Sequence, residues 1–150
     1  MNQIVEKALE LWGLHGTGYH LVAARENVVF RVDGADKPVA LRLHRKGYRT
    51  DQELMSELDW MAAVAKGGIN VQGPIPSTSG EMLHIVDGLQ VDVLSWLTGV
   101  SVAKALASRD ANGRAALFRE IGSQMARFHD IIDAWTPPVG FNRCAWDRFI

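Results

Sequence analysis

The run VALRLHRKGYR, residues 39–49, joins an alternating apolar strand pattern to a concentration of positive charge. The whole chain has 16 Lys and Arg against 17 Asp and Glu, so its net charge of -1 gives no general attraction to nucleic acid or to anionic membranes. Within the run the cations are Arg42, Arg45, Lys46 and Arg49, and no acid accompanies them. Arg42 interrupts the apolar part of the run, where a charge needs a partner or a ligand to offset its desolvation. Arg42 is therefore the first candidate for a functional side chain.

The strand pattern places Arg42 on a face that has room for a flat ligand carrying an anionic group. Successive side chains of a strand point to opposite faces, so Ala40, Arg42 and His44 share one face, and Ala40 is small. The helix that follows offers Glu57 as an ion-pair partner, and Glu53, one turn earlier on the same helix, is the alternative. A solvated Arg42 is the other interpretation, because an antiparallel sheet can keep one face in water.

The segments on either side of this run predict an α+β domain. Three β-prone runs joined by tight turns predict an antiparallel meander, and a helix of about four turns follows them. A Pro- and Gly-rich crossing then leads to a second hairpin, and beyond about residue 100 the periodicity is helical. Thr50 or Asp51 is the expected N-cap of the four-turn helix. The expected strands are 18–24, 27–33, 38–44, 81–87 and 89–97, and the expected helices are 2–12, 50–66, 101–110 and 113–135.

Composition places the chain in the class of cytoplasmic globular proteins. A length of 150 residues with 47% hydrophobic content suits one ordinary domain with a core. Cys144 is the only cysteine, so no internal disulfide is expected, and no Cys and His spacing typical of a zinc site is found. The N-terminal run has helical periodicity rather than the continuous apolar character of a signal peptide. No stretch approaches the ~20 apolar residues that a membrane span needs.

The order of several short motifs resembles the aminoglycoside phosphotransferase family, which includes homoserine and choline kinases and has a protein-kinase-like fold. VALR (39–42) is similar to the V-A-I-K of the third kinase strand, with Arg in place of Lys, and Glu57 lies in the following helix. The other motifs are ENVVFRV (26–32), GINVQGPIP (68–76), VLSWLTG (93–99), MARFHD (125–130) and CAWDRF (144–149). The resemblance runs over residues 18–149.

This resemblance implies a small nucleotide-binding lobe over residues 1–98, with a five-stranded antiparallel sheet and one helix. The first helices of an incomplete helical lobe would follow over residues 99–150. ATP is the implied cofactor, and Arg42 would contact its α- and β-phosphates while Glu57 holds Arg42 in place. Arg at this position can fork onto two phosphate oxygens, whereas Lys acts as a point charge.

Five further residues follow from the same resemblance. Glu26 and Asn27 would match the turn that covers the phosphates, although this turn lacks the glycines of the protein-kinase loop. Ala40 would lie beside the nucleotide on the strand that carries Arg42. Ser95 and Leu97 would match the hinge whose backbone groups read the edge of the adenine.

The catalytic loop of the fold is not found in these 150 residues. Phosphoryl transfer needs an Asp, an Asn five residues later and a further metal-binding Asp, and none of the asparagines has an Asp at that spacing. His129 and Asp130 lie within a helix, and His129 is expected to be packed there rather than catalytic. No catalytic or metal-ligating residue is therefore assigned, although magnesium is expected to accompany ATP.

The function expected from the sequence is that of the N-terminal, ATP-binding portion of an enzyme that transfers the γ-phosphate to a hydroxyl of a small molecule. Such a portion is expected to be inactive alone. The alternative is a non-catalytic interaction module that keeps the kinase-like scaffold. The acceptor and the choice between ATP and GTP stay open, and uncovered faces of the 113–135 helix predict self-association.

Overall fold

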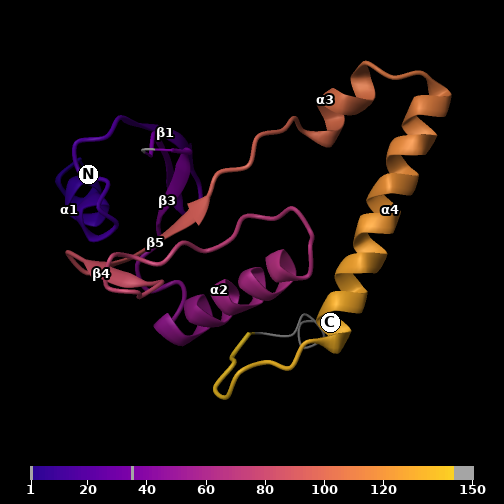
Figure 1. Ribbon diagram of the computed structural model, residues 1–150. Coiled ribbons are helices and arrows are strands. Elements are labelled where there is room, and N and C mark those ends of the chain that lie inside the picture. Colours follow the sequence, from indigo (N-terminus) through magenta and orange to yellow (C-terminus); the bar gives the residue numbers. More distant parts are fainter. Residues whose placement is uncertain (1, 35, 144–150) are drawn as a thin grey trace.

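The computed structural model describes residues 2–34 and 36–143, which form a five-stranded antiparallel sheet and four helices (Figure 1). In chain order the elements are α1 (Asn2–Leu11), β1 (Tyr19–Ala24), β2 (Val28–Val32), β3 (Val39–Leu43), α2 (Asp51–Lys66), β4 (His84–Val86), β5 (Leu89–Ser95), α3 (Val102–Ala107) and α4 (Ala111–Ala134). The strand order in the sheet is β1-β2-β3-β5-β4. This arrangement confirms the predicted α+β, kinase-like small-lobe fold. The CAWDRF segment with Cys144 lies outside the described residues.

The two faces of the sheet pack against different helices. Val5 and Leu9 of α1 are fully buried against one face, in a cluster that includes Leu41 and Leu43 of β3. Because side chains alternate along β3, Ala40 points to the opposite face, where it packs in a second cluster with residues of α2. Arg42 has the same parity as Ala40. The strand alternation therefore sends Arg42 toward α2 and away from the main core.

The N-terminus of α2 is fixed by a reciprocal capping box. The Oγ of Thr50 accepts a hydrogen bond from the Glu53 N–H at 3.2 Å, and the Glu53 carboxylate accepts one from the Thr50 N–H at 2.9 Å. Of the two expected N-caps, Thr50 is thus the one that the structure uses. Leu54 and Leu58 are buried one turn apart, and this phase of the helix brings Glu57 beside the sheet.

Helix α4 packs on α2 and stands away from the sheet (Figure 1). The two helices approach closely at Gly67, where an added Cβ would lie only 2.5 Å from the Ile131 Cδ1. All 24 residues of α4 belong to the described part of the chain, and none of them is buried. His129 is exposed, so the expectation that it is packed is wrong. The predicted apolar stripe of α4 is present, but only part of it, including Ile131, packs against another element.

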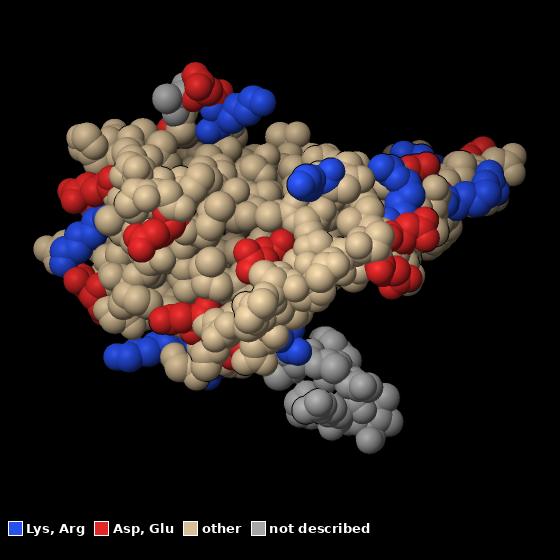
Figure 2. Space-filling view, turned by 60° about the horizontal axis from the view of Figure 1, so that its bottom comes forward, with Lys and Arg blue, Asp and Glu red and all other residues tan. Residues whose placement is uncertain are grey.

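The helices of the described residues include none with the length and apolar content needed to cross a lipid bilayer. On the face of the molecule shown in Figure 2, acidic and basic side chains lie scattered among uncharged residues. This face therefore carries no extended patch of one sign of charge.

Candidate functional site

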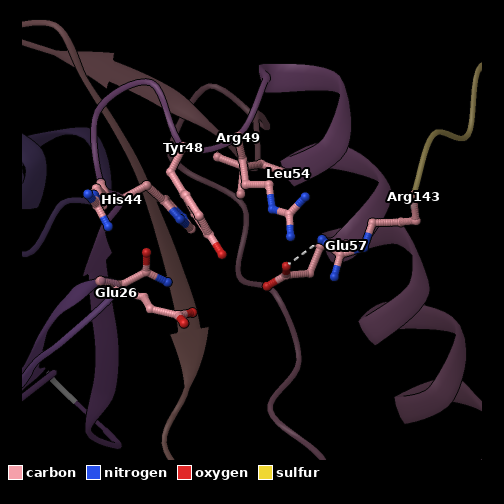
Figure 3. Close-up of a pocket in the computed structure, with 9 residues that line it drawn as sticks. Glu26, His44, Tyr48, Arg49, Leu54, Glu57 and Arg143 are labelled. Atoms are coloured by element: carbon pink, nitrogen blue, oxygen red, sulfur yellow. Dashed lines mark hydrogen bonds and ion pairs between the residues drawn. The ribbon is translucent and has the colours of Figure 1, made fainter. Parts of the chain in front are cut away.

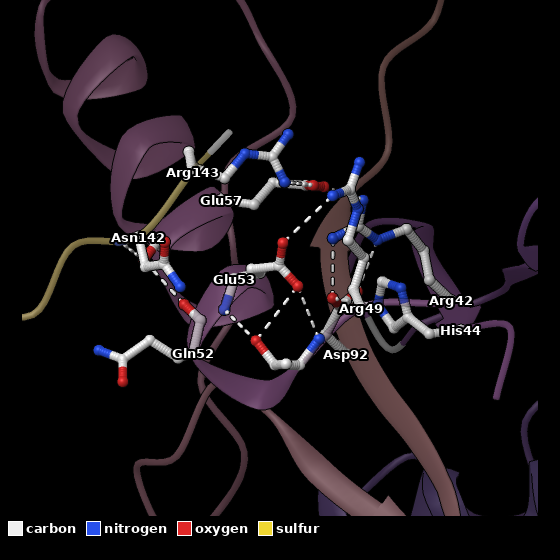
Figure 4. Close-up of polar contacts among 11 residues, drawn as sticks. Arg42, His44, Arg49, Gln52, Glu53, Glu57, Asp92, Asn142 and Arg143 are labelled. Carbon is white, nitrogen blue, oxygen red and sulfur yellow. Dashed lines mark hydrogen bonds and ion pairs between the residues drawn. The ribbon is translucent and has the colours of Figure 1, made fainter. Parts of the chain in front are cut away.

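The guanidinium of Arg42 is held between two carboxylates. Asp92 of β5 lies opposite Arg42 of β3 in the strand register. The Arg42 Nε and Nη2 groups donate to the two Asp92 oxygens, both at 2.7 Å, and Nη1 donates to the Glu57 Oε1 at 2.8 Å (Figure 4). The predicted ion pair between Arg42 and Glu57 is thus confirmed. Three of the five guanidinium N–H groups point at these carboxylates, which leaves one on each Nη without a hydrogen bond to any residue that the structure describes.

Asp92 is a residue of this site that the sequence interpretation missed. Its side chain is 0% exposed, and it also accepts a hydrogen bond at 2.8 Å from His44, whose Nε2 must be the donor because an ionised carboxylate only accepts. Burial by itself raises the pKa of Asp92, but the hydrogen bonds and charges of His44 and Arg42 outweigh burial and hold the pKa below its usual value. Asp92 is therefore a buried, ionised carboxylate.

Arg42 has the matching electrostatic environment. Its side chain is 12% exposed, and this burial lowers the pKa, but the hydrogen bonds and charges of Asp92 and Glu57 more than compensate and raise it overall. Arg42 is fully charged and is fixed in one orientation by bonds to both carboxylates. A bidentate bond of this kind specifies the plane of the guanidinium as well as its position.

Glu57 is shared between two arginines. One oxygen accepts from Arg42, and the other accepts from the Arg143 Nη1 at 2.9 Å. Glu53, the alternative partner of Arg42, is instead engaged in the capping box and in an ion pair with Arg49 at 3.2 Å. Between the two carboxylates that the sequence left open, the structure therefore joins Glu57 to Arg42.

A polar cavity of about 130 Å³ opens beside this cluster (Figure 3). It has room for several water molecules or a phosphate-sized group. Glu26 and Asn27 of the turn between β1 and β2 form one wall, so the structure brings these two predicted residues together with Glu57. The complete lining consists of Glu26, Asn27, His44, Arg45, Tyr48, Arg49, Leu54, Glu57 and Arg143.

Two arginines of the lining flank an aromatic ring. The guanidinium carbons of Arg45 and Arg49 lie 5.8 and 5.1 Å from the centre of the Tyr48 ring. Such contacts hold a cation in place without neutralising it. Arg45 and Arg49 thus line the cavity together with Arg143, and Arg49 and Arg143 are also paired with the carboxylates of Glu53 and Glu57.

The other three predicted residues lie away from the cavity, toward the end of β5. Ala40 is 1% exposed and packs with Leu58 and Leu94 between the sheet and α2. Ser95 is bound to Gly73: its N–H donates to the Gly73 carbonyl and its Oγ accepts from the Gly73 N–H, both at 2.8 Å. Leu97 follows the end of the strand and is 37% exposed.

The sequence model of the phosphotransferase enzyme family matches residues 20–149 of this chain. The chain belongs to this family. The match covers most of the chain and includes the strand of Arg42, the helix of Glu57 and the segment of Arg143. The predicted resemblance to aminoglycoside phosphotransferases is thereby confirmed.

Relatives of this phosphotransferase chain include amicoumacin kinase from Bacillus subtilis, which is 25% identical over 148 residues; the match covers 97% of this chain and 44% of the relative. A solved microcompartment-associated aminopropanol kinase is 26% identical, with a TM-score of 0.77, over 98% of this chain and 45% of that one. An amicoumacin kinase in complex with AMP-PNP, Ca2+ and Ami has the same fold, with a TM-score of 0.83 at 18% identity over 99% of this chain and 45% of that chain. The chain spans less than half the length of these proteins.

The donor set of this phosphotransferase chain fits a nucleotide polyphosphate. A phosphate group accepts several charge-assisted hydrogen bonds, and a cavity of suitable size lies on the far side of Glu57 from Arg42, which is not itself among the lining residues. Among residues 2–34 and 36–143, no group of three or more His, Cys, Asp and Glu side chains is arranged to hold a metal ion.

Proposed function

We propose that this chain is the nucleotide-binding portion of a phosphotransferase that passes the γ-phosphate of ATP to a hydroxyl of a small molecule. Residues 1–98 form the nucleotide-binding lobe in this proposal, and residues 99–150 begin the helical lobe. One observation carries the proposal: Arg42 is held by Asp92 and Glu57 so that an N–H on each Nη is left for a phosphate. Membership of the phosphotransferase family supports it.

In the proposed site, Arg42 binds the α- and β-phosphates, and its fork contacts two oxygens at once. Glu57 fixes the distance of the guanidinium from α2. Backbone N–H groups of Glu26 and Asn27 cover the phosphates from the turn between β1 and β2. Magnesium bound with ATP would reduce the repulsion between the phosphates, and none of these residues is assigned as its ligand.

The base of the nucleotide would lie along β3 and the end of β5. Ala40 is buried at 1% exposure and packs with Leu58 and Leu94, so its part would be to keep β3 small beneath the base rather than to contact it. Ser95 is fixed by Gly73, which positions the backbone that follows, and the backbone groups of Leu97, a residue that is 37% exposed, would contact the edge of the adenine. This half of the site depends on backbone contacts, so it places few demands on side-chain identity.

The proposal predicts that affinity rises with the number of phosphates. Titration of the 150-residue chain with Mg-ATP, Mg-ADP, AMP and adenosine is expected to show at least about tenfold tighter binding of Mg-ATP than of adenosine, because each charge-assisted contact adds free energy. Isothermal titration calorimetry measures this directly, and Mg-GTP tests the choice of base. Equal affinity for ATP and adenosine would contradict the role of Arg42.

No phosphate transfer by the 150-residue chain is expected, because its sequence lacks the Asp and Asn of the catalytic loop. The assay is the release of ADP in the presence of amino alcohols and aminoglycosides. Sustained release of ADP would contradict the proposal that these 150 residues bind the nucleotide but lack the residues that catalyse transfer.

The exposed face of α4 favours a second candidate function, that of a non-catalytic interaction module. Phe118 and Met125 are 58% and 57% exposed on this helix. Apolar groups gathered on one helix face favour association with another apolar surface. In this alternative, nucleotides would leave the melting temperature of the chain unchanged.

Self-association through α4 is predicted for the 150-residue chain. Sedimentation velocity is expected to show a mass that rises with concentration, and Phe118→Glu is expected to shift the chain toward monomer. Ile85→Glu is the matched control, because Ile85 is 56% exposed but lies on β4. A monomer at every concentration would remove this prediction, and an equal effect of both substitutions would place the contact elsewhere.

A further inference from the structure

The segment after α4, residues 140–143, is docked along α2 by three polar contacts (Figure 4). The Asn142 N–H donates to the Ser56 Oγ at 2.9 Å, and the side-chain amide of Gln52 donates to the Gly140 carbonyl. The third contact is the ion pair of Arg143 with Glu57. Gln52, Ser56 and Glu57 all belong to α2. The segment is therefore bound to the same helix that positions Arg42.

Two features make this docking specific. Ser56 is 3% exposed, and its Oγ donates to the Gln52 carbonyl at 2.7 Å while it accepts from Asn142, so its hydroxyl orientation is fixed. Gly140 has a φ of 86°, and a Cβ at this position would lie 2.7 Å from the Gln52 Nε2. A residue with a side chain is therefore disfavoured at position 140 both by the backbone conformation and by the contact with Gln52.

The result of this docking is a second guanidinium beside the polar cavity. Arg143 is part of the cavity lining and is 33% exposed, with one N–H directed at Glu57. Arg42 binds the other oxygen of the same carboxylate, so Glu57 draws two guanidinium groups of like charge together. Like charges held close in this way favour an additional anion that accepts from both.

We propose that Arg143 is a further phosphate-binding residue, which the docked segment 140–143 brings to the nucleotide. This inference rests on the nucleotide site proposed above and extends it to a part of the chain beyond the small lobe. Arg42 binds the phosphates from the sheet, and Arg143 binds them from the side of α2. Glu57 orients both arginines, and Asp92 orients only Arg42.

The test compares the affinities of Arg143→Gln and Arg143→Lys for Mg-ATP and for adenosine by calorimetry, with melting temperatures measured in parallel. Arg143→Gln is expected to weaken Mg-ATP about tenfold, the loss of one charged contact, and to leave adenosine unchanged. Arg143→Lys is expected to give an intermediate loss because it keeps the charge without the fork. It also retains the ion pair with Glu57, so it reports on binding if Arg143→Gln does not fold.

A second pair of variants tests the docking itself. Gly140→Ala is expected to release the segment and to weaken Mg-ATP as much as Arg143→Gln does. Gly122→Ala is the matched control, because a Cβ at Gly122 on α4 meets nothing within 4 Å. It is expected to leave both affinities unchanged.

The other possible outcomes distinguish failure of the Arg143 inference from failure of the proposed nucleotide site. If Arg143→Gln binds Mg-ATP like the wild type while Arg42→Ala does not, Arg143 only tethers the segment, and the nucleotide site stands. If Arg143→Gln weakens ATP and adenosine equally, its effect is structural and the inference fails. If the wild type binds Mg-ATP no better than adenosine, the proposed function and the inference fail together.

Discussion

Replacement of Arg42 by alanine is expected to weaken the binding of Mg-ATP by about a hundredfold or more, because two charge-assisted contacts to phosphate are lost together. Adenosine should bind as before. Calorimetry with both ligands gives the result, and loss of ATP binding with retained adenosine binding is the expected signature. Unaltered ATP affinity in a folded Arg42→Ala chain would exclude Arg42 from the nucleotide site.

Further variants separate three effects of the Arg42→Ala substitution: the loss of charge, the loss of the planar fork and the loss of folding stability. Arg42→Lys keeps the charge but cannot bridge Asp92 and Glu57 with a planar fork, so an intermediate loss is expected. Arg42→Ala also leaves Asp92 buried without its main cation, which lowers stability. The double variant Arg42→Met, Asp92→Asn removes both charges at once and is expected to fold more stably than Arg42→Ala while still failing to bind Mg-ATP.

Asp92→Asn is expected to lower the free energy of unfolding by on the order of 3 kcal/mol, because it removes one partner of a buried ion pair. Urea unfolding at neutral pH measures the change. Asp87→Asn is the matched control, since Asp87 pairs with Lys7 at 2.8 Å but both side chains are largely exposed. An exposed pair contributes at most about 1 kcal/mol. Equal effects of the two substitutions would contradict the electrostatic account of Asp92.

The pH dependence of stability follows from the lowered pKa of Asp92. A carboxyl whose pKa is lower in the folded than in the unfolded chain stabilises the fold above its unfolded value of about 3.9. This contribution is lost as the pH falls through the lower pKa of the folded state. The difference in stability between the wild type and Asp92→Asn is therefore expected to be full at pH 7 and to shrink in acid below pH ~4. A difference independent of pH would point to packing instead.

Local patterns were sufficient to predict the elements and one contact of the site. Alternation along residues 39–43 located β3, and helical spacing placed Glu57 within reach of Arg42, because both depend on neighbours in sequence. The register of β3 against β5 joins residues 50 positions apart, so Asp92 did not stand out. Asp92 could have been found from the sequence because it is a single acid within the apolar run of β5, just as Arg42 is a single cation within the apolar run of β3.

The remaining contacts depend on tertiary packing that local sequence does not encode. Arg143 lies 86 positions from Glu57, and only the path of the chain after α4 brings the two together. The exposure of His129 has the same origin, because periodicity shows which face of α4 is apolar but not whether another element covers it.

The sheet places the main hydrophobic cluster and the charged cluster around Arg42 on opposite faces. The cluster of α1 lies on one face, and Arg42 with its carboxylates lies on the other. Sequence change on the α1 side can thus alter stability without reshaping the charged cluster around Arg42. Stability can therefore be adjusted from the α1 face alone, whereas a change among the buried charges on the α2 face alters stability and the proposed recognition together.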